Sequence, residues 1–106
     1  MRIEPFTIYI FYMPWENGGK NRPVLVFLHS INEVSVYSIT TKYEDKSEAI
    51  KQKYFKINDI TNTGLIRQSY VDTITRYTIP QSFLENKIPI GKLSNEDIKR
   101  FMEFLH

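Results

Sequence analysis

The chain has 106 residues, of which 42% are hydrophobic and 25% are charged, as expected for one globular domain spanning residues 1–106. Its net charge of +2 gives only a mild indication of an anionic partner. The sequence has no cysteine, which excludes disulfides, thiol nucleophiles and cysteine zinc sites. Its two histidines form no metal-binding motif. We expect no metal and no other cofactor.

The first third of the chain predicts three strands. Residues 6–13 (FTIYIFYM) are aromatic and β-branched, which predicts a strand buried on much of both faces and ended by Pro14. The polar stretch WENGGKN predicts a loop, and residues 24–28 predict the second strand. A turn around Asn32 then leads into a third strand at residues 34–40, whose alternate side chains face opposite sides.

The middle of the chain begins with its one strongly charged stretch, TKYEDKSEAIKQK, which predicts an exposed loop with a helical turn. Two further strands are expected in YFKIND and LIRQSYVDTITRYTI, separated by a turn at Gly64 and ended by Pro80. QSFLENK predicts a short helix. No apolar segment approaches the roughly twenty residues that span a bilayer, and the N-terminus lacks signal-peptide features, so we expect no membrane association and a cytoplasmic location.

The C-terminal segment carries the clearest helix pattern. Ser94 is the expected N-cap, with Glu96 and Asp97 in the first turn, where the helix dipole favours acidic side chains. Ile98, Phe101, Met102 and Leu105 form one apolar stripe that must pack on the sheet. The expected fold is therefore mainly β (α+β): a small antiparallel SH3-like barrel with a C-terminal α-helix.

Few residues suggest enzyme chemistry by themselves. No serine lies in a nucleophile elbow, a lone strand-end His29 is more often structural, and the acidic pairs have simpler explanations in solvation and helix capping. Gly18-Gly19-Lys20 precedes a strand and not a helix, so it is no P-loop, but it predicts a mobile basic lid that brings Lys20 and Arg22 near a phosphate. Further polar groups are expected where strands begin or end, at Thr40-Thr41-Lys42 and at Arg67-Gln68-Ser69.

The order of four motifs resembles the MazF/PemK family of toxin endoribonucleases from type II toxin–antitoxin pairs. The matching segments, which run in order over almost the whole chain, are NRPVLVF, VYSITTK, TGLIRQS and GKLSNEDIKRFMEFL. The resemblance implies a PemK-type barrel in a homodimer, with a cognate antitoxin and single-stranded RNA or mRNA as partners. It also implies that the protein is an mRNA interferase, a hydrolase that arrests growth by cleaving mRNA without a metal ion. In that reaction the 2′-hydroxyl of the RNA substrate is the nucleophile, and the products carry 2′,3′-cyclic phosphate and 5′-hydroxyl ends.

The resemblance carries catalytic roles to Arg22, Thr40 and Arg67. It also implies contacts with RNA from residues of the first loop and from neighbours of the catalytic positions, namely Trp15, Glu16, Asn17, Lys20, Thr41, Lys42, Gln68 and Ser69. Some relatives have an Asp where this chain has Ser69, and some have a His in the first loop, where this chain has none. The group that handles protons is therefore not identified by the motifs.

Two alternatives remain open at this point. One is a non-catalytic member of the same barrel class that binds a protein, as gyrase-poisoning toxins do, although the chain lacks their terminal W-G-I-type tail and ends FMEFLH. The other is a small β-barrel that binds RNA or protein without toxicity. Metal-independent cleavage of RNA, lost on substitution of Arg22 or Thr40, would separate the enzyme from both.

Overall fold

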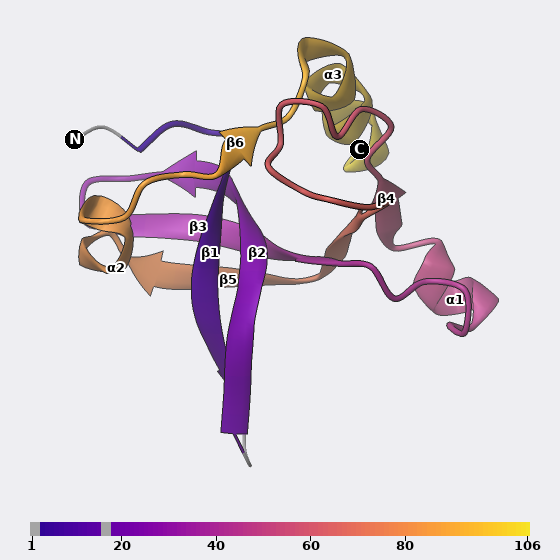
Figure 1. Ribbon diagram of the computed structural model, residues 1–106, viewed down its shortest axis with the longest axis horizontal. Helices are drawn as coiled ribbons and strands as arrows, with labels where there is room; N and C mark the ends of the chain where they lie inside the picture. The colour runs from indigo at the N-terminus through magenta and orange to yellow at the C-terminus, as the bar shows by residue number, and fades with distance from the viewer. Residues whose placement is uncertain (1–2, 16–17) are drawn as a thin grey trace.

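The computed structural model describes residues 3–15 and 18–106, with the side chain of Trp15 outside the description. Six strands of the described chain form one sheet in the order β4-β5-β3-β2-β1-β6, and every neighbouring pair is antiparallel (Figure 1). The strands are β1 (Thr7–Trp15), β2 (Gly18–His29), β3 (Glu33–Thr40), β4 (Tyr54–Lys56), β5 (Tyr70–Pro80) and β6 (Gly91–Lys92). The sheet curls into a half-barrel, in which the β1–β2 hairpin crosses β3 and β5.

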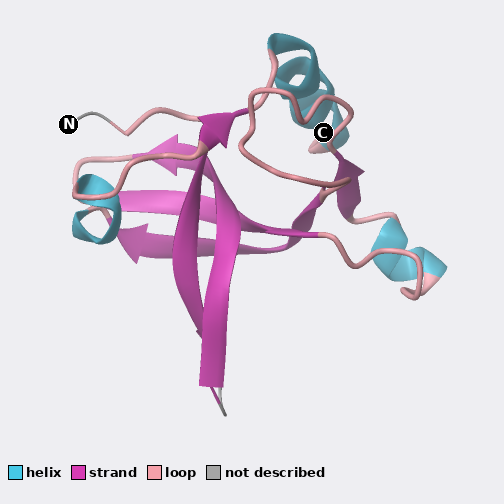
Figure 2. Cartoon of the chain, viewed as in Figure 1, coloured by secondary structure: helices cyan, strands magenta, loops and turns pink. Residues whose placement is uncertain are grey.

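Three helices of the described chain lie outside the sheet: α1 (Glu48–Lys51), α2 (Ser82–Glu85) and α3 (Asn95–Phe104) (Figure 2). The two short helices fall where a helical turn and a short helix were predicted. A mainly β, antiparallel, curled sheet with a C-terminal helix confirms the predicted fold class. No helix in the described residues is long and apolar enough to cross a membrane.

The sheet buries side chains on both of its faces, in two separate clusters. On β3, Val34 and Val36 belong to one cluster, whereas Tyr37 and Ile39 belong to the other, which confirms the predicted alternation. All four of these side chains are buried. The pairing of β3 with β5 shifts register between Val36 and Ser38, which is a β-bulge or a similar irregularity.

Helix α3 covers the cluster that contains Tyr37 and Ile39. Its Phe101 is fully buried, with its ring 5.1 Å from that of Phe55 and 5.7 Å from that of Tyr37. The predicted cap is confirmed, because Ser94 Oγ accepts a hydrogen bond from the backbone N–H of Asp97 at 3.1 Å. These contacts fix the helix on the sheet by burial of apolar area and by capping.

Asp97 has a larger role than the predicted stabilisation of the helix dipole. Its carboxylate is 1% exposed, accepts the backbone N–H of Asp59 at 2.9 Å, and accepts a hydrogen bond from Arg100 at 2.6 Å. A buried carboxylate needs such partners to offset its desolvation. Asp97 therefore ties α3 to the loop between β4 and β5, a link that the helix pattern did not predict.

The predicted end of the first strand at Pro14 is wrong, and so is the predicted loop WENGGKN over its residues 18–21. Strand β1 continues to Trp15, and β2 begins at Gly18, with Pro14 paired with Gly19 and Met13 with Lys20. A Cβ on Gly19 would lie 2.7 Å from the Tyr12 hydroxyl oxygen and 2.8 Å from the Met13 carbonyl oxygen. Glycine is required here by close packing within a hairpin, so the sequence feature that suggested a mobile lid belongs to a paired strand.

The predicted fifth strand also begins later than expected. Leu65 to Ser69 form an irregular segment, and β5 starts at Tyr70. The turn at Gly64 is confirmed, with φ of +78° and its Cα packed against Ile90 so closely that a Cβ would lie 2.4 Å from the Ile90 carbonyl oxygen. The segment from Gly64 to Ser69 is therefore held next to the chain that leads into β6.

Candidate active site

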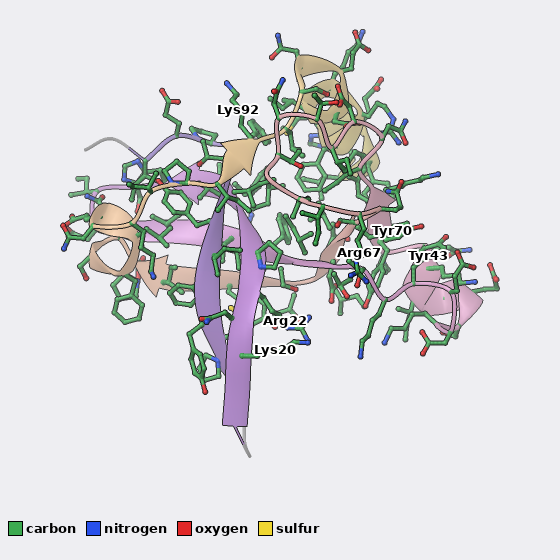
Figure 3. The ribbon with its side chains drawn as sticks, in the orientation of Figure 1. Lys20, Arg22, Tyr43, Arg67, Tyr70 and Lys92 are labelled. Carbon is green, nitrogen blue, oxygen red and sulfur yellow. The ribbon has the colours of Figure 1, made fainter. Side chains whose placement is uncertain are left out.

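A cavity of about 400 Å³ opens where the β1–β2 hairpin, the end of β3 and the Gly64–Ser69 segment meet. We call it the basic cavity, because four of its lining side chains are cationic and none is acidic among the described residues. It is lined by Ile10, Lys20, Asn21, Arg22, Pro23, Ile39, Thr40, Thr41, Lys42, Gly64, Leu65, Ile66, Arg67, Ser69 and Ile90. In Figure 3, Arg22 on β2 and Arg67 on the segment before β5 lie on the same side of the hairpin.

Arg22 is held by the hairpin rather than by a loop. It is half-buried, and its backbone pairs with Phe11 of β1, one position before Pro23, which pairs with Ile10. Proline has a fixed φ and no N–H, and it is tolerated in this strand at the point where β2 enters the apolar run from Val24 to Val26. The guanidinium is thereby attached to a rigid element at the rim of the cavity.

Thr40 is the last residue of β3 and lies near Arg22. Val24 of β2 pairs with Ser38 of β3, and Arg22 and Thr40 each lie two residues from that pair, on the same side of the sheet. The Thr40 Oγ1 accepts the backbone N–H of Lys42 at 3.1 Å. A hydroxyl has one donor in addition to its acceptor sites, so that donor can still be offered to a ligand.

Arg67 reaches the cavity from the segment that Gly64 positions. The hydroxyl of the neighbouring Ser69 is 2% exposed and donates to the Arg67 carbonyl oxygen at 2.9 Å. At the start of the segment, the Thr63 Oγ1 accepts the Leu65 N–H at 3.1 Å and donates to the Ile60 carbonyl oxygen at 2.7 Å. These hydrogen bonds hold the irregular backbone in one conformation, and they thereby fix the position of the Arg67 backbone.

The structure brings together the three residues for which catalytic roles were predicted, Arg22, Thr40 and Arg67. Four of the predicted RNA-contacting residues also line the basic cavity, namely Lys20, Thr41, Lys42 and Ser69. Gln68 does not: its amide donates to the carbonyl oxygens of Ile57 and Ser69 at 2.8 and 3.1 Å, which is a role in holding the loop. Glu16, Asn17 and the side chain of Trp15 lie outside the described residues.

A second cavity, of about 280 Å³, adjoins the basic cavity and shares Arg22, Thr40 and Lys42 with it. We call it the polar cavity. Its remaining lining residues are Met13, Pro14, Ser38, Lys46, Tyr54, Asp72 and Tyr77. None of these was predicted as a site residue, although the carboxylate of Asp72 inside an otherwise uncharged β-branched stretch, YVDTIT, was a signal in the sequence.

Tyr54 and Asp72 interact within the polar cavity. Burial of the phenol raises the pKa of Tyr54 above its ordinary value, and the nearby negative charge of Asp72 and a hydrogen bond to it raise this pKa further. The positive charge of Arg22 acts on the pKa of Tyr54 in the opposite direction. The phenol therefore lies within the electrostatic reach of both Asp72 and Arg22, and it is a hydrogen-bond donor at neutral pH.

Three tyrosines near the site pack against other side chains. Tyr37 is buried in the cluster under α3, and Tyr43 and Tyr70 stack on one another with ring centroids 4.2 Å apart and ring planes inclined by 4°. The Lys51 ammonium lies 5.1 Å from the Tyr43 ring centroid. The stacked pair of Tyr43 and Tyr70 lies beside Arg67 in Figure 3.

His29 is exposed and lines neither cavity. Its Nε2 lies 2.6 Å from the Gln81 Oε1, at the end of β2 away from both cavities. Within the described chain, no three His, Asp or Glu side chains gather as ligands for a metal ion.

Comparison of the sequence with protein-family models and with curated proteins gives no match. Comparison of the structure with solved structures finds similarity to one described as Mycobacterium tuberculosis toxin MazF-mt6. The two share 25% sequence identity with a TM-score of 0.65, and the alignment covers 93% of this chain and 91% of the other. The similarity thus extends over nearly the whole length of both chains.

Proposed function

Because this chain belongs to the MazF/PemK family of toxins, we propose that it is a metal-independent endoribonuclease that cleaves single-stranded RNA, including mRNA, at specific sequences. The observation that carries the proposal is the meeting of Arg22, Thr40 and Arg67 at one cavity from three separate elements. Each of these residues lies in one of the ordered motifs that resemble the family. Their meeting in space is a separate observation, because the order of motifs along the chain does not require it.

The proposed chemistry needs no nucleophile from the protein. The 2′-oxygen of the substrate attacks the adjacent phosphorus, the bond to the 5′-oxygen breaks, and the products carry a 2′,3′-cyclic phosphate and a 5′-hydroxyl. Arg22 stabilises the charge that develops on the phosphoryl oxygens, an effect that is usually the largest contribution to catalysis. Thr40 donates a hydrogen bond to the same phosphate, and Arg67 adds a second cation.

The shape and charge of the basic cavity suit a single strand of RNA. Lys20 and Lys42 can contact flanking phosphates, and such contacts position a nucleic acid without reading its sequence. Ile10, Ile66 and Ile90 line the same cavity, and Ile66 is 89% exposed. Apolar surface beside cations accommodates unstacked bases, which are available in single strands and not in a duplex.

We also propose the family's setting for this protein: a homodimer in the cytoplasm, with a cognate antitoxin that restrains the growth arrest caused by mRNA cleavage. The four cations of the basic cavity are complementary to an acidic antitoxin segment, which would then compete with RNA. Exposed Phe83 and Ile88 offer apolar surface for a protein contact.

The test is incubation of the purified protein with a long single-stranded RNA in EDTA, followed by labelling of free 5′-hydroxyl ends. The proposal predicts discrete fragments that accept the label directly. Intact RNA, or fragments that appear only when Mg²⁺ is added, would exclude it.

A further inference from the structure

Arg22 and Thr40 line two cavities and not one. The basic cavity holds cations on one side of them, and the polar cavity, on the other side, contains Tyr54 and Asp72. A phosphate bound by Arg22 and Thr40 would therefore lie at the boundary between the two cavities. Groups in the polar cavity are the nearest candidates for proton transfer at that phosphate.

The proposed reaction requires a group that accepts the proton of the 2′-hydroxyl. A guanidinium group keeps its proton in proteins and accepts no hydrogen bond, so Arg22 and Arg67 are unsuitable as bases. Among the described residues that line either cavity, Asp72 is the only carboxylate, and none is histidine. His29 is engaged with Gln81 at the far end of β2.

Strand order places Asp72 between Ser38 and Tyr54, in the cavity that Thr40 also lines. On β5, Asp72 pairs with Ser38 of β3 on one side and with Tyr54 of β4 on the other. Asp72 is half-buried, and its Oδ1 accepts the Ile74 N–H at 2.9 Å. This bond orients a carboxylate that lines the polar cavity beside Tyr54, its direct partner on β4.

We propose that Asp72 is the general base of this enzyme and that Tyr54 is the residue that positions it. The inference rests on the proposed function, because a base is needed only if RNA is cleaved. It is a property of this chain's own residues, since Asp72 lies outside the four motifs that carry the family resemblance.

The proton balance is as follows. An oxygen of the Asp72 carboxylate takes the proton of the 2′-hydroxyl as the 2′-oxygen forms its bond to phosphorus. The bond from phosphorus to the 5′-oxygen breaks, the 5′-oxygen takes a proton from water, and Asp72 later returns its own proton to water. Lys42 and Lys46 line the same cavity and lower the electrostatic cost of bringing the carboxylate near a phosphate.

The experiment compares Asp72→Asn with wild type in single-turnover RNA cleavage and in binding to a 2′-O-methyl RNA of the same sequence, which has no nucleophile. Loss of a general base is expected to slow cleavage by about 10²- to 10⁴-fold while affinity for the 2′-O-methyl RNA is retained. The matched control is Glu33→Gln, on an exposed carboxylate at the opposite end of β3, and it should cleave at the wild-type rate.

A pH series separates a base from a structural residue. In Asp72→Asn the cleavage rate should rise about tenfold per pH unit, because hydroxide from solution then serves as the base. Tyr54→Phe, which removes only one hydroxyl, should slow cleavage and leave the affinity for the 2′-O-methyl RNA unchanged. This second variant tests the pair even if Asp72→Asn folds poorly.

The outcomes distinguish this inference from the function on which it rests. A wild-type protein that leaves RNA intact would exclude the proposed function. If wild type cleaves and Asp72→Asn cleaves equally well, the function stands and the inference is wrong. Equal losses of cleavage and of 2′-O-methyl RNA binding in both variants would also overturn the inference, because Asp72 would then be structural.

Discussion

Arg22 occupies a position at which the physical requirements of a strand and of a phosphate site coincide. Its backbone is paired with β1, Pro23 restricts the next φ angle, and its guanidinium faces two cavities. The paired backbone fixes the point from which the arginine side chain extends. A phosphate would therefore meet a cation that is already positioned, which is the condition for electrostatic catalysis.

Replacement of Arg22 tests the catalytic role that is proposed for it. Arg22→Ala is expected to lower the rate of RNA cleavage by about 10²- to 10³-fold, because one preorganised donor to the transition state is lost. Arg76→Ala is the matched control, since Arg76 is an exposed arginine on β5 that lines neither cavity. Single-turnover cleavage rates measure both, and equal rates for the two variants would contradict the role of Arg22.

Residues of the site differ in how far the sequence predicts them. Arg22, Thr40 and Arg67 could be predicted because each lies in a motif with a fixed place in the order of elements. Asp72 and Tyr54 could not, because they meet only through the strand order β4-β5-β3, which is not the order along the chain. Nothing local in YVDTIT says which strands will lie on either side of Asp72.

The glycines of strand β2 show why the first loop is wrongly predicted from composition. The sequence predicts mobility at Gly18 and Gly19, yet both are paired with β1, and a Cβ on Gly19 would lie too close to the backbone of Met13 and Pro14. At Gly64, by contrast, turn residues around it correctly indicated a backbone that needs positive φ. Glycine meets a steric requirement in both places. Only the fold shows whether that requirement is a close contact, as at Gly19, or a positive φ, as at Gly64.

Gly64→Ala is expected to destabilise the segment that carries Arg67. The φ of +78° disfavours alanine by about 1–2 kcal/mol, and a Cβ there would lie 2.4 Å from the Ile90 carbonyl oxygen, so the free energy of unfolding should fall by about 2 kcal/mol or more. Chemical denaturation measures this change. The control Asn62→Ala, at an exposed position of the same loop, should stay within about 0.5 kcal/mol of wild type, and similar values for both variants would contradict the account.

The sheet has a buried cluster of side chains on each face. This arrangement follows from the alternation of side chains along the strands. Alternation along β3 predicted which residues face which cluster, and the Ser94 cap and apolar stripe predicted α3. The two residues of β6 carry no periodicity, and the buried Asp97 link joins segments 38 residues apart, so neither could be predicted.

Burial of tyrosines makes the stability of the whole molecule sensitive to alkaline pH. Burial is the main cause that raises the pKa of Tyr9, Tyr54 and Tyr70 above the ordinary value of 10.0. The folded state keeps these protons at a pH where the unfolded chain releases them. Their contribution to stability is therefore complete below pH 10 and is lost as the pH rises through the folded-state pKa values.

We expect the free energy of unfolding to fall as the pH rises above 10, and to fall less steeply in Tyr9→Phe, which has one fewer tyrosine with a raised pKa. Urea denaturation at a series of pH values measures both slopes. An identical slope in wild type and in Tyr9→Phe would contradict the contribution of Tyr9.

We propose that this protein cleaves RNA by attack of the substrate's own 2′-hydroxyl, with Arg22 and Thr40 at the phosphate. Mass spectrometry of the 3′ ends of fragments produced in EDTA tests it most directly. The account predicts 3′ ends that carry a 2′,3′-cyclic phosphate and that are absent from the Arg22→Ala reaction. Fragments with 3′-hydroxyl and 5′-phosphate ends, or cyclic phosphate ends formed equally by Arg22→Ala, would contradict it.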